Sequence, residues 1–259
     1  MRNKVIESFD EAVADIPDGA TVMMHSFVGP GGVCQNLIRA LRDKGSKDLT
    51  VIACAFGIGG MAGRPFAEII TPGDLVGNKQ VKKVVTTWVM TRKAYALPTP
   101  LAAAVKAGAV EVELTGQGTL SQRIRAGGSG IGAFYSPVGL GTILEEGKEK
   151  RVINGREYLL EYPLRAEFGF VRARKADRMG NLVYRGTARS FNPLIALACD
   201  VVIAEVDEIV EVGELDPEVV ITPGILVDRI VRVQEGDHGS AADRRAGIER
   251  LFRGTEGGQ

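Results

Sequence analysis

The chain is poor in the residue types that build metal sites and disulfide frameworks. Its 259 residues contain two histidines, His25 and His238, and three cysteines without any paired spacing. Metal sites in proteins usually combine paired cysteines or clustered histidines, and neither pattern is present. An odd number of widely spaced cysteines in apolar surroundings is typical of reduced, buried thiols. We therefore expect no metal site, no disulfide and no permanently bound cofactor; the cysteines are Cys34, Cys54 and Cys199.

Net charge and long hydrophobic runs are also missing. Lysine plus arginine and aspartate plus glutamate number 32 each, so the overall charge attracts neither nucleic acid nor an anionic membrane. No apolar run reaches the roughly 20 residues of a transmembrane helix. The N-terminus, residues 1–4 followed by an amphipathic helix, lacks a signal-peptide core. We expect a cytoplasmic protein that binds neither nucleic acid nor membranes.

Two common catalytic patterns are absent or incomplete. The Gly-x-Ser-x-Gly elbow of serine hydrolases does not occur. The glycines of residues 57–60 follow an expected strand and formally fit the dinucleotide-binding fingerprint, but Pro65 stands where the long helix of that motif would run. The next expected strand ends without the acidic residue that would bind a ribose. These differences argue against nicotinamide binding.

What the chain does contain is a regular alternation of strand and helix patterns. Apolar runs of strand length occur at residues 21–24, 49–56, 84–89, 110–114 and 201–206. Helical patterns separate them at 33–44, 99–108 and 193–199, of which the first ends at a glycine and the second begins with Thr-Pro. This alternation predicts an α/β fold with an open, mainly parallel sheet flanked by helices, and a β-rich excursion near residues 150–190.

The length and composition are those of an ordinary globular protein with a substantial core. We predict one domain over residues 1–233 and a C-terminal tail over residues 234–259. The tail is expected to contain a flexible joint after Gln234 and a short charged helix near residues 241–252.

A glycine-rich segment follows the expected strand 110–114. Residues 115–142 read TGQGTLSQRIRAGGSGIGAFYSPVGLGT. This segment resembles the alpha subunit of the family I CoA transferases of the 3-oxoacid type, in which Gln-Gly-Thr-Leu precedes a helix with Arg-Ile-Arg-Ala-Gly-Gly, and Phe-Tyr and a proline turn follow. Matches in the same order run from Asp18-Gly19 to Thr222-Pro223-Gly224, so the resemblance covers most of residues 5–232.

The resemblance implies the fold of that superfamily and a CoA transferase activity. CoA would move between an acyl-CoA and a free carboxylic acid by a ping-pong mechanism through a glutamyl-CoA intermediate. In the family the nucleophilic glutamate lies on a beta subunit, so no catalytic residue is expected on this chain. The implied partners are a beta subunit, in a heterodimer or heterotetramer, and a coenzyme A thioester with its acid as substrates.

The resemblance assigns substrate binding to Gln117, whose amide matches one that donates a hydrogen bond to the substrate carboxylate, and to Gly118 beside it. The alternative is that Gln117 only satisfies backbone groups at the end of strand 110–114. Gly127, Gly128 and Gly130 could bring the backbone close to CoA or end the helix of residues 120–126, and both can hold at once. Arg123 and Arg125 either face the CoA phosphates or are solvated helix charges, and the solvated interpretation is the simpler one.

The loop of residues 27–32 presents backbone amides at the start of a helix, a suitable place for a carboxylate or phosphate. We assign four of its residues to substrate binding: Phe27, Gly29, Gly31 and Gly32. Here the chain departs from the family, because His25-Ser26 replaces the usual Gly-Gly. His25 could orient an unusual acyl group or titrate near neutrality, but an ordinary hydrogen-bonded histidine at a strand end is the simpler interpretation.

A second departure concerns acyl specificity. Ala53-Cys54-Ala55 stands where the 3-oxoacid transferases typically have a pair of asparagines near the substrate, and Ser190 replaces another asparagine. With Cys54 and Ala55 at the substrate, a less polar pocket would suit a longer or more apolar acid than acetoacetate or succinate. Two alternatives stay open: a subunit of a CoA-thioester or ring-cleaving hydrolase on the same scaffold, and a non-catalytic ligand-sensing subunit.

Overall fold

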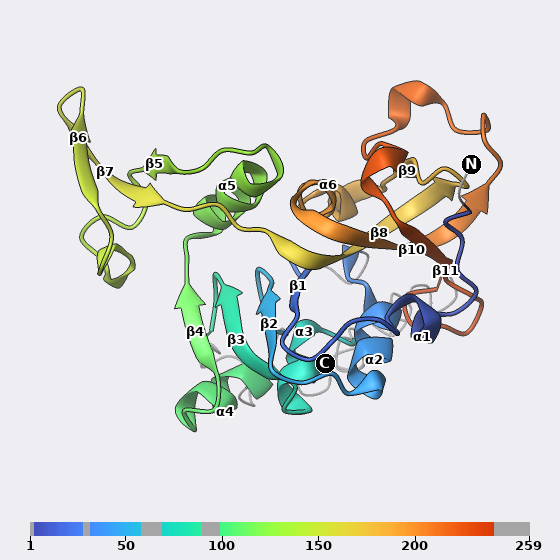
Figure 1. The fold of residues 1–259 in the computed structure, drawn as a ribbon, viewed down its shortest axis with the longest axis horizontal. Helices are drawn as coiled ribbons and strands as arrows, with labels where there is room; N and C mark the ends of the chain where they lie inside the picture. Colours follow the sequence, from blue (N-terminus) through green and yellow to red (C-terminus); the bar gives the residue numbers. More distant parts are fainter. Residues whose placement is uncertain (1–2, 28–31, 58–68, 90–98, 241–259) are drawn as a thin grey trace, which may run out of the picture.

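The computed structural model describes residues 3–27, 32–57, 69–89 and 99–240. Its centre is an eight-stranded sheet with the strand order β11-β10-β8-β1-β2-β3-β4, to which β9 adds by pairing with β8 (Figure 1). All pairings are parallel except that of β8 with β9. The strands are β1 (Thr21–Met24), β2 (Leu49–Ile52), β3 (Val81–Thr86), β4 (Glu111–Leu114), β8 (Ala166–Asp177), β9 (Leu182–Val183), β10 (Cys199–Val210) and β11 (Arg229–Arg232). The predicted open, mainly parallel sheet is confirmed.

Helices cover both faces of this sheet because successive side chains of a strand point to opposite sides. On β1, Val22 belongs to a core cluster with α1 to α4, whereas Met23 belongs to a second cluster with α5 and α6. The α-helices are α1 (Phe9–Ala12), α2 (Gln35–Lys44), α3 (Pro72–Gly77), α4 (Pro100–Lys106), α5 (Gln117–Gly128) and α6 (Asn192–Ala198). Four short 3₁₀ turns complete the described elements: η2 (Ile143–Glu145), η3 (Gly186–Arg189), η4 (Pro217–Val219) and η5 (Gly224–Leu226).

Local signals place the helix ends where they were expected. α2 ends at Gly45, whose φ of 81° lies in the left-handed region that glycine adopts without strain. α4 begins after Thr99, whose hydroxyl accepts a hydrogen bond from the Ala102 amide, with Pro100 as its first residue. These caps fix where the chain enters and leaves the sheet.

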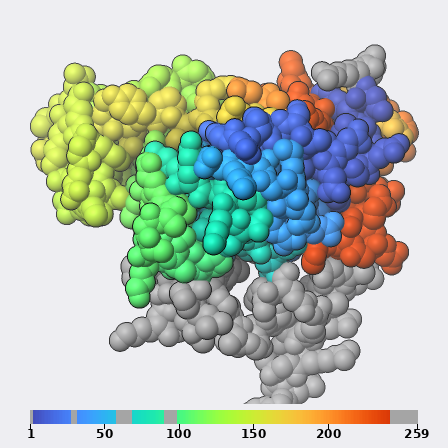
Figure 2. Space-filling model, turned by 60° about the horizontal axis from the view of Figure 1, so that its bottom comes forward, coloured from blue at the N-terminus to red at the C-terminus, as the bar shows by residue number. Residues whose placement is uncertain are grey.

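A three-stranded antiparallel sheet projects from one end of the molecule, and we call residues 134–161 the arm. It consists of β5 (Phe134–Ser136), β6 (Lys150–Ile153) and β7 (Arg156–Glu161) in the order β5-β7-β6. Figure 2 shows the arm in yellow-green at the left end of the molecule. All four residues of β6 are exposed.

The predicted β-rich excursion is present, with boundaries that differ from those expected. It begins before residue 150, and it includes the antiparallel hairpin of β8 and β9. Between these parts, β8 lies in the middle of the main sheet, parallel to both β1 and β10. Its side chains are buried on both faces over residues 168–172, as expected of a central parallel strand.

The first residues of the tail contact a buried charged cluster at the start of α2. Glu205 is fully buried and accepts hydrogen bonds from the Asn36 and Leu37 amides, while Arg172 Nε lies 3.5 Å from its carboxylate. Asn36 Nδ2 also donates to the His238 carbonyl at 2.8 Å. The expected joint thus has fixed contacts up to residue 240, and the helix expected at 241–252 lies outside the described residues.

Within the described ranges, no helix has the length and apolar character needed to cross a membrane. The same residues contain no group of three or more histidine, cysteine, aspartate or glutamate side chains that could hold a metal ion.

Candidate functional site

Four parallel strands end at the same edge of the sheet, and the segments that follow them carry most of the predicted site residues. His25 and Phe27 follow β1, Cys54 and Ala55 follow β2, and Gln117 follows β4. In open α/β sheets, ligands bind at the carboxyl ends of the strands. This edge is therefore the candidate functional site.

Hydrogen bonds join these segments into one surface. Ser26 Oγ accepts from the Ala55 amide at 2.9 Å, and Thr87 Oγ1 donates to the Cys54 carbonyl at 2.8 Å. The Thr115 amide donates to the Thr86 carbonyl at 3.0 Å. The segments after β1 and β2 are therefore fixed to each other, as are those after β2 and β3 and those after β3 and β4.

Gln117 is the first residue of α5, and its side chain is exposed. It makes no hydrogen bond to any of the described residues, so the alternative in which it satisfies backbone groups of β4 has no contact to support it. Its neighbours Thr115 and Thr119 are 2% and 3% exposed, and among the described residues neither hydroxyl has a hydrogen-bond partner. Buried hydroxyls usually have one, so the start of α5 holds unused hydrogen-bonding capacity.

The three glycines at the end of α5 have different environments. A Cβ on Gly127 would lie 2.0 Å from the Leu164 carbonyl oxygen, and one on Gly128 would lie 2.4 Å from Leu197. Both glycines are within the helix, which continues two residues beyond its expected end. Gly130 turns the chain at a φ of 71° and has open space around its Cα. The first two glycines are needed for packing of the chain against itself.

His25 is buried at the end of β1, and its Nε2 lies 2.8 Å from Ser190 Oγ. Its Nδ1 has no hydrogen-bond partner among the described residues. The ring meets the edge of Phe191 at 6.5 Å, and the Phe27 ring lies 6.2 Å from the same phenylalanine. Burial lowers the pKa of His25 to about 4, while the nearby Gly32 backbone acts to raise it. His25 is therefore neutral at physiological pH, and its contacts are those of a hydrogen-bonded histidine at a strand end rather than of a group that titrates near neutrality.

The cysteines are unpaired thiols, as predicted. Cys34 and Cys54 are buried, and Cys199 is partly buried. Burial raises the pKa of the Cys54 thiol, which is only partly offset by the Thr87 hydroxyl at 3.2 Å. Burial also raises the pKa of Cys199 to about 12. None of these thiols has the lowered pKa of a reactive cysteine.

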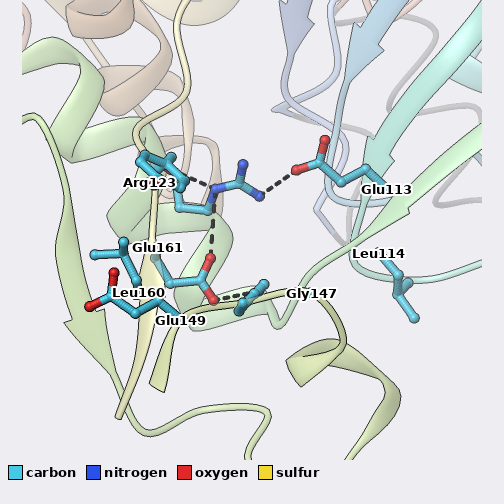
Figure 3. A pocket seen from close by; sticks show the side chains of 9 residues that line it. Glu113, Leu114, Arg123, Gly147, Glu149, Leu160 and Glu161 are labelled. Carbon is cyan, nitrogen blue, oxygen red and sulfur yellow. Dashed lines mark hydrogen bonds and ion pairs between the residues drawn. The ribbon is translucent and has the colours of Figure 1, made fainter. Parts of the chain in front are cut away.

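A pocket of about 380 Å³ opens between β4 and the arm (Figure 3). Arg123 of α5 crosses it. Its Nη1 lies 2.7 Å from a Glu113 oxygen, its Nε donates to the Tyr162 carbonyl at 2.8 Å, and the same Nε is 4.0 Å from Glu161. Glu161 is 2% exposed and pairs with Lys148 at 2.6 Å. The cluster joins the arm to the main sheet.

The expectation of a solvated Arg123 is wrong, because its guanidinium is buried among carboxylates of two strands. The positive charge of Arg123 is already paired with those carboxylates, so it is not available to a CoA phosphate. Arg125 is exposed, as expected. Burial works to raise the pKa of Glu113, but the hydrogen bonds and charges of Arg123 and Lys83 outweigh it and lower the pKa.

Sequence reasoning missed several residues of this edge. Glu113, Lys148 and Glu161 come from separate elements and have no common motif, so nothing local indicates that they meet. The threonines beside Gln117 belong to the glycine-rich segment of residues 115–142, but an unpaired buried hydroxyl is visible only in three dimensions. Two predicted substrate-binding residues, Gly29 and Gly31, lie outside the described residues.

Comparison with known proteins decides the family. Residues 6–233 match the coenzyme A transferase family. The chain belongs to this family. It is 46% identical over 233 residues to the A subunit of the 3-oxoadipate CoA-transferase of Pseudomonas putida, an alignment that covers 90% of this chain and 95% of that protein. It is 40% identical over 230 residues to the A subunit of a succinyl-CoA:3-ketoacid coenzyme A transferase of Helicobacter pylori, with 89% and 92% covered.

Solved structures agree on the fold. Glutaconate coenzyme A-transferase from Acidaminococcus fermentans superposes with a TM-score of 0.74 at 18% identity, covering 97% of this chain and 87% of that chain. An acyl-CoA transferase of Escherichia coli O157:H7 gives a TM-score of 0.77 at 23% identity, covering 92% and 48%. The chain is thus the alpha subunit of a CoA transferase, an enzyme whose substrates are CoA thioesters.

Proposed function

We propose that this alpha subunit works with a beta subunit to move CoA from an acyl-CoA to a free carboxylic acid by a ping-pong mechanism. The nucleophile is a glutamate of the beta subunit. Its carboxylate attacks the thioester carbonyl and forms an acyl anhydride while CoA leaves as the thiolate. The thiolate then attacks the glutamyl carbonyl of that anhydride, which releases the first acid and leaves glutamyl-CoA. The second acid takes CoA by the reverse of these steps.

The observation that carries the proposal is the placement of Gln117. It begins α5 at the carboxyl edge of the sheet, exposed and without a hydrogen bond to the described residues. A neutral amide in this position is free to donate to a carboxylate or to the oxyanion of a tetrahedral intermediate. The names of the two relatives supply the other half of the argument, because each is named as one subunit of its enzyme and therefore implies a partner.

The remaining predicted residues divide between the acid and CoA. We assign His25, Phe27, Gly29, Gly31, Gly32, Cys54, Ala55, Gln117 and Gly118 to the acyl group and its carboxylate. For CoA we retain the backbone of Gly130, which has open space around it, whereas Gly127 and Gly128 are covered by other parts of the chain. For His25, Phe27, Cys54, Ala55 and Gln117 the assignment rests on their position at one edge of the sheet. Gly29 and Gly31 are assigned from the sequence alone.

Kinetics of the assembled pair test the mechanism. The chain is co-expressed with its beta subunit, and rates are measured over a matrix of acyl-CoA and acid concentrations. A ping-pong reaction gives parallel lines in double-reciprocal plots. Incubation with acyl-CoA alone should also leave a CoA thioester on one glutamate of the beta subunit, detected as a mass increase that hydroxylamine removes. Intersecting lines without a thioester adduct would contradict the proposal.

The second candidate is a CoA-thioester or ring-cleaving hydrolase on the same scaffold. The observation in its favour is that His25 and Ser190, both departures from the transferase pattern, lie in contact at the candidate site. Release of free CoA that does not depend on an acceptor acid, with a beta subunit lacking the glutamate, would support the hydrolase. Ligand binding by the pair without turnover would support a ligand-sensing subunit.

A further inference from the structure

The two departures from the family pattern meet in space. His25 follows β1 and Ser190 follows η3, 165 positions later in the chain, and His25 Nε2 lies 2.8 Å from Ser190 Oγ. The 3-oxoacid transferases that the chain resembles have glycine at the first position and tend to have asparagine at the second. A glycine has no side chain that could bond to position 190. The hydrogen bond therefore depends on the histidine at position 25, which the family pattern lacks.

The imidazole of His25 is held from several sides. Its exposed fraction is 1%, the edge of Phe191 lies against it, and the missing side chain of Gly32 leaves the space that the ring fills. A Cβ on Gly32 would lie 2.6 Å from His25 Cε1 and 2.9 Å from Nδ1. This packing fixes the ring so that Nε2 faces Ser190.

Ser190 has the opposite environment. It is exposed at the end of η3, and the residue after it, Phe191, packs against the Phe27 ring. A serine hydroxyl can donate once and accept twice, so a single bond to His25 leaves capacity on the exposed side. The result is one oriented hydroxyl beside an aromatic pair, which suits an acyl chain better than it suits the phosphates of CoA.

We propose that His25 and Ser190 form one specificity element that recognises a keto or hydroxyl oxygen on the acyl chain of the substrate acid. When Nε2 carries the imidazole proton, it donates to Ser190 and frees the hydroxyl proton for a keto oxygen. When Nδ1 carries the proton, Nε2 accepts from Ser190, whose oxygen then accepts from a substrate hydroxyl. Ser190 is the contacting residue and His25 the positioning residue; the inference rests on the proposed function and deepens it.

The neutral state of His25 fits this role. Because its pKa is lowered to about 4, the ring carries no charge to attract a second carboxylate in the neutral pH range. A neutral ring can switch its proton between the two nitrogens without a change of charge.

Kinetics with matched acids test the element in the assembled pair. Acids with a 3-oxo or 3-hydroxy group are compared with the unsubstituted acid of the same length, and the ratio of their kcat/KM values is measured. Ser190→Ala should lower this ratio about twofold to tenfold, as loss of one hydrogen bond does. Ser190→Thr should keep most of it, and Thr187→Ala, which removes an exposed hydroxyl from the same 3₁₀ turn, should not change it. An unchanged ratio in Ser190→Ala would overturn the proposal.

Nitrogen NMR gives a readout that does not require turnover. The chain has only two histidines, so ¹⁵N-histidine labelling and a His238→Gln variant assign the His25 resonances. Adding the 3-oxo acid to the pair should shift the Nε2 resonance of the wild type but not of Ser190→Ala, and the unsubstituted acid should shift neither. Equal shifts by both acids would overturn the inference even if the pair proves to be a hydrolase.

Mass spectrometry tests a competing role of Ser190 as a nucleophile. If Ser190 were a nucleophile activated by His25, incubation with acyl-CoA would leave an ester on its oxygen and release CoA. An acyl adduct on Ser190 would overturn a recognition role, and its absence together with the altered substrate ratio supports one.

Discussion

The two sides of the candidate site differ in how their polar side chains are held. Gln117 is exposed, begins a helix and bonds to none of the described residues, whereas His25 is buried, packed on Phe191 and bonded to Ser190. The first side matches the family pattern that the sequence resembles, and the second departs from it. A side-chain amide without a hydrogen bond to the described residues of its own chain is available to bind a ligand or a partner subunit. A buried imidazole acts only through the neighbour that it holds.

This contrast predicts which substitutions damage the fold and which damage only function. On the Gln117 side, substitutions at the C-terminal end of α5 should reduce stability, and substitutions at its N-terminal end should reduce catalysis. On the His25 side, the buried ring should contribute to stability, and Ser190 should contribute to selectivity.

Gly127→Ala should have the largest effect. The new Cβ would lie 2.0 Å from the Leu164 carbonyl oxygen, which is backbone and cannot move aside without shifting the chain that leads into β8. We expect a loss of more than about 4 kcal/mol of unfolding free energy or failure to fold, at the upper end of overpacking effects. Thermal and urea unfolding of the purified chain measure this.

Gly118→Ala in the same helix is the matched control for stability. A Cβ there meets nothing within 4 Å. Alanine is the better helix former, so the variant should gain about 0.5–1 kcal/mol. Equal destabilisation by both alanines would show that α5 is not fixed at its end by close packing.

Arg123→Ala should have the next largest effect. It removes the partner of Glu113 and leaves Glu161, which is 2% exposed, with Lys148 as its remaining ion pair. The loss should stay somewhat below the roughly 3–5 kcal/mol of a fully buried pair, because Glu113 is partly exposed and Glu161 keeps Lys148. Arg125→Ala, on the exposed face, should change stability by less than about 0.5 kcal/mol. Similar losses for both arginines would contradict the assigned role of the cluster in holding the arm.

Gln117→Ala should reduce turnover without reducing stability. Loss of one positioned donor lowers kcat by about tenfold to a thousandfold elsewhere. Because the side chain is exposed and has no bond to the described residues, the melting temperature should stay the same. Gln122→Ala, an exposed glutamine in the same helix, is the control and should keep wild-type turnover. Full activity of Gln117→Ala in the assembled pair would show that this glutamine has no role in catalysis.

Local signals in the sequence were sufficient for much of the fold. Thr99-Pro100 and Gly45 mark helix ends by backbone chemistry that operates within a few residues. The alternation of apolar strands with helices indicates a parallel sheet, and the Gln117 segment follows its expected strand directly in the sequence. These features depend on neighbours in the chain, so a single sequence reveals them.

Contacts between distant segments could not be predicted in this way. The burial of Arg123 depends on Glu113 of β4 and Glu161 of β7, and no local pattern records that these strands face each other. From the sequence, β8 belongs to the expected β-rich excursion because its pairing with β9 is local, whereas its pairing with β1 spans more than a hundred residues. The bond between His25 and Ser190 likewise joins two departures that the sequence shows only one at a time.

The last effect we predict is a pH dependence of stability that comes from His25. Its pKa is lowered from 6.5 to about 4 in the folded chain, so between these pH values the unfolded chain binds a proton that the folded chain does not. The contribution is therefore fully present above pH 6.5 and is lost as the pH falls toward 4, by about 3 kcal/mol if the whole shift is realised. Urea unfolding at several pH values, for wild type and His25→Asn, isolates this contribution, because carboxylates titrate in both proteins. If the free energy of unfolding changed with pH equally in wild type and His25→Asn, the prediction would be contradicted, and water or another group would be shown to solvate the protonated ring.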